Sequence, residues 1–115
     1  MDQNQFVEAI KIAVLESSKK ATESNLLKPP GRQPAENLMG LSQWFNNLKT
    51  EDKEMVLKVL EQGVEATVFG FFCVLDGVRS IENQGEKGRL KLFYEKNHES
   101  VLLNNPDDEY LHNLL

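Results

Sequence analysis

The apolar residues of this chain change their spacing once, near Asp76 and Gly77, and this change constrains the fold more than any other feature. Before it, apolar residues recur every three or four positions, as on one face of an α-helix. After it, Leu90, Leu92 and Tyr94 occupy alternate positions, which is typical of a half-buried β-strand. Because helical and strand patterns are segregated along the chain, the sequence predicts an α+β fold.

Prolines and glycines divide the first part of the chain into helices. A first helix is predicted over 3–20, with Asp2 as its N-cap, and a second over 35–48. The intervening segment, 21–34, contains Pro29-Pro30-Gly31, which does not allow a continuous helix. This segment is therefore predicted to be a surface loop.

A third helix, long and buried, is predicted from Thr50 to about residue 77. Its apolar residues follow one helical stripe: Leu57, Leu60, Val64, Val68, Phe71, Phe72 and Leu75. Residues 68–75 also have high β-propensity, so a buried strand is the alternative there. Small residues follow a second line, which predicts the close approach of a neighbouring helix: Gly63, Ala66, Gly70, Cys73 and Gly77.

Residues 78–104 are predicted to form a small three-stranded antiparallel meander. Its strands are a weak one over 78–83, a strong one around 90–95 and a third over 100–103. Residues 105–115 are predicted to form a short helix that begins with Asn105-Pro106. With a helical part over 1–77, the whole chain, 1–115, is expected to be one domain.

Composition limits the chemistry and the compartment. Cys73 is the only cysteine, so an intrachain disulfide, a zinc ribbon and a CxxC redox motif are excluded. The N-terminus has no basic segment of a signal peptide, and the apolar stretch 66–75 has about half the length of a membrane-spanning helix. We therefore expect a cytoplasmic protein without membrane association. Nucleophile-elbow and phosphate-loop motifs are absent, so no catalytic residue, cofactor or metal ligand is predicted.

Charge is distributed unevenly. The formal net charge is −5, which argues against nucleic acid as a partner. Residues 85–98 have a net charge of +2, whereas residues 99–115 have a net charge of −4 and contain no Lys or Arg. Acidity is thus concentrated at the C-terminal end.

This distribution predicts a non-catalytic interaction domain that binds a protein partner. Asp107, Asp108 and Glu109 are expected to meet basic groups, with Tyr110 and Trp44 as aromatic anchors. Immunity-type inhibition, in which a small acidic protein covers a basic active site, is one specific form of this function. The resemblance to such proteins is one of composition only.

Two other hypotheses remain. The cluster Asp76, Arg79 and Glu82 lies where the third helix ends, and it is expected either to terminate the helix or to line a site for a small molecule or an enzymatic reaction. In the second case a pocket walled by Phe69, Phe72 and Tyr94 is predicted. A homodimer formed through Trp44 or through an unpaired strand at 100–103 is a third interpretation.

Overall fold

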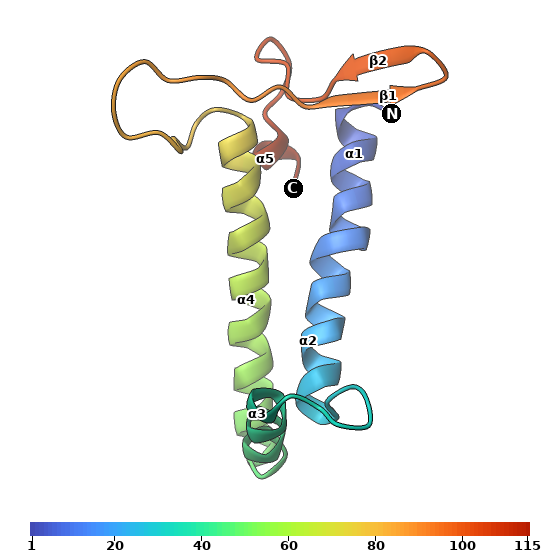
Figure 1. Ribbon diagram of the computed structural model, residues 1–115, viewed down its shortest axis with the longest axis vertical. Coiled ribbons are helices and arrows are strands. Elements are labelled where there is room, and N and C mark those ends of the chain that lie inside the picture. Colours follow the sequence, from blue (N-terminus) through green and yellow to red (C-terminus); the bar gives the residue numbers. More distant parts are fainter. The chain divides into compact units, whose positions relative to one another are not determined.

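The computed structural model describes residues 1–115 and contains helices together with one antiparallel sheet (Figure 1). The prediction of a mixed helix-and-strand fold is confirmed. The elements are α1 (Gln3–Ile10), η1 (Lys11–Glu16), α2 (Ser17–Leu27), α3 (Glu36–Asn46), α4 (Thr50–Leu75), β1 (Phe93–Lys96), β2 (Glu99–Leu102) and α5 (Leu111–Leu114). The chain divides into two compact units, one of Met1–Ala13 with Ala66–Leu115 and one of Val14–Glu65. The expectation of a single domain stays a prediction.

The N-terminal helical segment is longer than predicted. It begins with a capping box, in which the Asp2 carboxylate accepts from Gln5 N at 2.8 Å and Gln5 Oε1 accepts from Asp2 N at 2.9 Å. Helical structure continues beyond residue 20 to Leu27 as η1 and α2. It ends at Leu27, and Lys28 takes an extended conformation. Lys28 precedes Pro29, and a proline disfavours helical backbone angles in the residue before it.

A π-helical turn, η1, interrupts the regular α-helix. Val14 lies seven residues after the buried Val7, on the same face of a regular α-helix, but Val14 is exposed and Leu15 is buried. A π-turn needs more residues than an α-turn to complete one revolution, so it rotates the following side chains backwards around the axis. The next residue along, Leu15, is therefore the one that becomes buried.

In the unit Val14–Glu65, side chains of α3 bind the C-terminal end of α2. Asn46 Nδ2 donates to the carbonyl oxygens of Leu26 and Leu27 at 3.4 and 3.1 Å, and Ser42 Oγ donates to Leu27 O at 3.5 Å. These bonds satisfy carbonyl groups that have no partner within the helix. Phe45, on the same helix, is buried and forms the centre of this unit.

The segment 68–75 is helical, as predicted, and forms the end of α4. This helix, predicted to be long and buried, is long but has buried residues only in its last third: Val68, Gly70, Phe72 and Cys73. Side chains of α4 are buried where another helix packs against them. Phe72 packs against Phe6 of α1, with ring centroids 6.0 Å apart, whereas Phe71 is 61% exposed. No helix, α4 included, combines the length and apolarity that a membrane span requires.

The predicted three-stranded meander is a two-stranded hairpin. β1 and β2 pair in antiparallel register, with Phe93 opposite Leu102, and the predicted third strand is β2. Asn97 and His98 connect them with φ values of 53° and 66°, as in the hairpin turn that needs positive φ at both central residues.

The weak strand predicted over 78–83 does not form. Ser80 Oγ donates to Glu82 O and accepts from Glu82 N, and the Glu82 carboxylate accepts from Gly88 N at 2.9 Å. These local bonds occupy backbone groups that a sheet would use. Residues 78–92 consequently form the long irregular segment between α4 and β1 in Figure 1.

Candidate functional site

Asp76 joins the end of α4 to α5. Its side chain is 2% exposed and its carboxylate accepts three hydrogen bonds, from Leu111 N at 2.9 Å, from His112 N at 3.0 Å and from the His112 ring at 2.7 Å. Because a carboxylate only accepts, Nδ1 of His112 carries the hydrogen in this contact. Asp76 therefore caps a helix that lies 35 residues further along the chain.

Asn104 is a second buried polar connection at the same end of α4. It is 5% exposed, and its Nδ2 donates to Leu75 O at 2.6 Å and to Leu90 O at 2.9 Å. Its Oδ1 accepts from Leu92 N at 2.8 Å, and its backbone oxygen accepts from Arg89 Nη2 at 3.2 Å. One amide thus holds the helix end and the segment that enters β1.

Gln3 fixes the C-terminal segment from the other side. Its Nε2 donates to Leu103 O at 2.8 Å and to Glu109 O at 2.9 Å. These two carbonyl groups flank residues 105–108. Together with Asp76 and Asn104, Gln3 therefore fixes the backbone on both sides of this turn.

The helix predicted to begin at Asn105 is shorter than expected. Asn105 Oδ1 accepts from Asp107 N at 3.1 Å, which makes a local side-chain turn instead of a helix cap. Helical structure begins only at Leu111, and the preceding Tyr110 makes no capping bond with its side chain. The carboxylate of Asp76 performs the capping instead.

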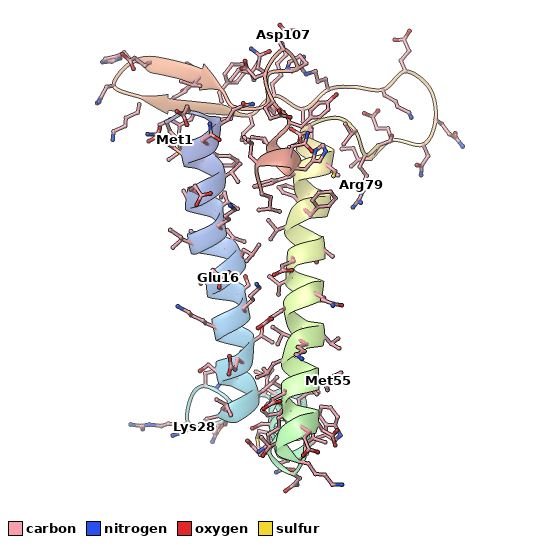
Figure 2. The ribbon with its side chains drawn as sticks, turned by 180° about the vertical axis from the view of Figure 1, so that it is seen from behind. Met1, Glu16, Lys28, Met55, Arg79 and Asp107 are labelled. Atoms are coloured by element: carbon pink, nitrogen blue, oxygen red, sulfur yellow. The ribbon has the colours of Figure 1, made fainter.

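We call residues 105–110 the acidic turn. Asp107, Asp108, Glu109 and Tyr110 are exposed, and Figure 2 shows Asp107 at the far tip of the turn. Neither Asp107 nor Asp108 makes a side-chain hydrogen bond or an ion pair, whereas Glu109 Oε1 accepts from Asn113 Nδ2 at 2.8 Å. The Tyr110 ring stacks on the His112 ring, with centroids 5.2 Å apart.

Trp44, the other predicted aromatic anchor, lies on α3 in the unit Val14–Glu65, and its side chain is exposed. The acidic turn belongs to the other unit and is complete without it. A contribution of Trp44 to partner binding stays a prediction.

The same unit contains the Lys19 ammonium, whose Nζ lies 2.8 Å from Glu65 Oε1. This hydrogen bond, with added attraction from Glu16, raises the pKa of Lys19 above its usual 10.5.

No hydrogen bond or ion pair joins the side chains of Asp76, Arg79 and Glu82, and their role as a site stays a prediction. The Asp76 carboxylate accepts hydrogen bonds from α5, and the Glu82 carboxylate accepts one from the backbone N–H of Gly88.

The guanidinium of Arg79 covers Gly70, and it would meet a Cβ placed there. The close neighbour of Gly70 is thus an arginine side chain rather than a second helix, and Ala66 is exposed, so the predicted helix approach along the small residues is wrong.

A hollow of about 600 Å³ lies at this end of α4. Residues 74–82, 87–90 and Pro106 line it, and Asp76, Arg79 and Glu82 are among them. The aromatic walls predicted for such a pocket are wrong, because Phe69, Phe72 and Tyr94 lie elsewhere. Its wall instead combines aliphatic side chains with three cationic ones, those of Arg79, Lys87 and Arg89.

No group of three or more His, Cys, Asp or Glu side chains is gathered at a metal-binding distance. Cys73 is buried in the core.

No protein-family model, no characterised protein and no solved structure matches this chain. Its function must therefore be inferred from its own residues.

Three residues that build this site were missed in the sequence: Gln3, Asn104 and His112. Each makes contacts with residues distant in the chain, and no local pattern marks such partners. One signal was present for Asn104, because a polar residue directly follows the apolar Leu102 and Leu103 and so falls within a core segment.

Proposed function

We propose that this protein is a non-catalytic interaction domain whose acidic turn binds a basic surface of a protein partner. The observation that carries the proposal is the contrast between the backbone and the side chains of the turn. The backbone is held by the half-buried Gln3 and by the buried side chains of Asp76 and Asn104, whereas the carboxylates of Asp107 and Asp108 are exposed and have no cation partner within the chain.

A fixed turn suits binding because little conformational freedom is lost when the partner arrives. The ordering of residues 103–112 is already achieved by Gln3, Asp76 and Asn104. A partner therefore meets carboxylates in a defined arrangement. The binding free energy is not spent on ordering a flexible tail.

Charge supports the same conclusion. Residues 99–115 contain four acidic residues and no Lys or Arg, so the turn is a local source of negative potential. Such a patch steers a basic partner toward the site and raises the association rate. Tyr110 adds an exposed aromatic ring beside the carboxylates, and its stacking on His112 limits the movement of that ring.

The test compares two triple variants of the full chain. The first, Asp107→Asn with Asp108→Asn and Glu109→Gln, neutralises the acidic turn. The second, Glu23→Gln with Glu54→Gln and Glu95→Gln, changes the net charge by the same amount at exposed positions elsewhere. Both variants and the unmodified chain are immobilised and exposed to lysate of the native host, and bound proteins are quantified at two salt concentrations.

The proposal predicts a basic protein that the unmodified chain and the control triple variant retain equally and the acidic-turn variant loses. Its binding is expected to weaken at the higher salt concentration, because exposed charges are screened. Carbodiimide cross-linking of that protein is expected to join its lysines to Asp107 or Asp108. Equal retention by both triple variants would refute the assignment of the acidic turn.

A further inference from the structure

The hollow at the end of α4 is a second feature, which shares only Pro106 with the acidic turn. It lies where the buried end of the helix meets the irregular segment 78–92. Its volume, about 600 Å³, is within the range of roughly 300–1,000 Å³ typical of small-molecule sites. We propose that it binds an organic anion with an aliphatic body, of which a short-chain carboxylate is the simplest example.

The cations of the hollow supply the first argument. Arg79, Lys87 and Arg89 line it, and none of them forms an ion pair within the chain. The two carboxylates that line the hollow, those of Asp76 and Glu82, accept hydrogen bonds from other groups of the chain. Asp76 is buried beneath three hydrogen-bond donors, and one Glu82 oxygen accepts from the backbone. A positive charge thus remains uncompensated in a chain whose formal net charge is −5.

Aliphatic side chains supply the second argument. Val78, Ile81 and Leu90 line the same hollow and are 50%, 63% and 43% exposed. The irregular segment presents them to the solvent instead of packing them into the core. Scattered exposed apolar residues are ordinary, but three around one concave surface make a place where an aliphatic chain is removed from water.

The cations and the aliphatic side chains together define the ligand class. A bare inorganic anion would use the cations and leave the aliphatic side chains exposed, and a neutral hydrocarbon would do the reverse. Only a molecule that joins an anionic group to an aliphatic chain satisfies both. Arg89 has a further role, because its guanidinium also holds Asn104 O, so the freely available cation for a test is Lys87.

The experiment is a titration of the isotope-labelled full chain, followed through its backbone amide resonances, with three matched probes. Hexanoate has the charge and the chain, acetate has the charge alone, and 1-hexanol has the chain alone. We expect hexanoate to shift amides of 74–90 and to bind at least tenfold more tightly than either other probe.

Two variants with one control locate the contacts. Lys87→Gln is expected to weaken hexanoate binding about two- to fivefold, the range for one exposed ion pair, without changing the response to hexanol. Ile81→Ser is expected to weaken both. Lys91→Gln, which removes a cation of the same segment that does not line the hollow, is expected to change neither.

Several outcomes would overturn the proposal. Equal affinity for hexanoate and acetate would mean a site for charge alone, and equal affinity for hexanoate and hexanol would exclude the cations. Equal effects of Lys87→Gln and Lys91→Gln, shifts confined to residues outside 74–90, or no response to hexanoate would refute it as well. None of Asp107, Asp108 and Glu109 lines the hollow, so this proposal and the partner-binding proposal fail independently.

Discussion

Replacing Asp76 with alanine tests how strongly one carboxylate fixes the C-terminal segment. The substitution removes the acceptor for the backbone N–H groups of Leu111 and His112 and for the His112 ring. Leu111 is completely buried, so water does not readily replace the lost acceptor at its N–H group. The variant is therefore expected to lose stability rather than to rearrange at no cost.

The magnitude follows from the number and kind of these bonds. A hydrogen bond to a charged group contributes about 1.5–3 kcal/mol, and a buried donor left without a partner costs about 1–3 kcal/mol. Removal of the carboxylate also relieves the cost of keeping that charge out of water, which offsets part of the loss. We expect a net decrease of about 2–4 kcal/mol in the free energy of unfolding, a large part of the roughly 5–15 kcal/mol of an ordinary domain.

Urea unfolding, followed by circular dichroism at about 222 nm, measures this loss, and hydrogen exchange at the amides of Leu111 and His112 locates it. Asp108→Ala is the matched control, because it removes the same group from an exposed position without a side-chain bond, and its effect is expected to stay within about 0.5 kcal/mol. If Asp76→Ala changed stability no more than this control and left both amides protected, the carboxylate would not hold α5.

Two further predictions concern the helices. Gly70→Ala is expected to be neutral or to stabilise the protein by up to about 1 kcal/mol, because the added Cβ meets only the flexible end of the Arg79 side chain while helix propensity improves; a loss above about 1 kcal/mol in a urea melt would contradict this. The raised pKa of Lys19 means that its hydrogen bond to Glu65 stabilises the fold fully below pH 10.5 and is lost as the pH rises through that raised value. Lys19→Met is therefore expected to lose less stability than the unmodified chain as the pH rises above 10.5, and parallel curves of unfolding free energy against pH would disprove the contribution.

Features that depend on neighbouring residues were predictable from the sequence. The capping box at Asp2, the break before Pro29 and the helix through 68–75 each follow from a local pattern. The exposure of the acidic residues in the candidate site belongs to this group, because charged side chains without partners stay in water. The two strands of the hairpin were predicted as well, although the additional strand over 78–83 does not form.

The arrangement of the site was decided by residues far apart in the chain. Asp76 was recognised as notable, but its partner is His112 rather than Arg79 or Glu82, and Asn104 reaches back 29 residues to Leu75. Gln3 meets the carbonyl group of Glu109, 106 residues away. A polar side chain satisfies its hydrogen bonds with whichever groups folding brings within about 3 Å, and sequence periodicity contains no information about that choice. The sequence therefore determined which segments are helical and where the charge lies, whereas tertiary contacts held the acidic turn on both sides and shaped the hollow beside it.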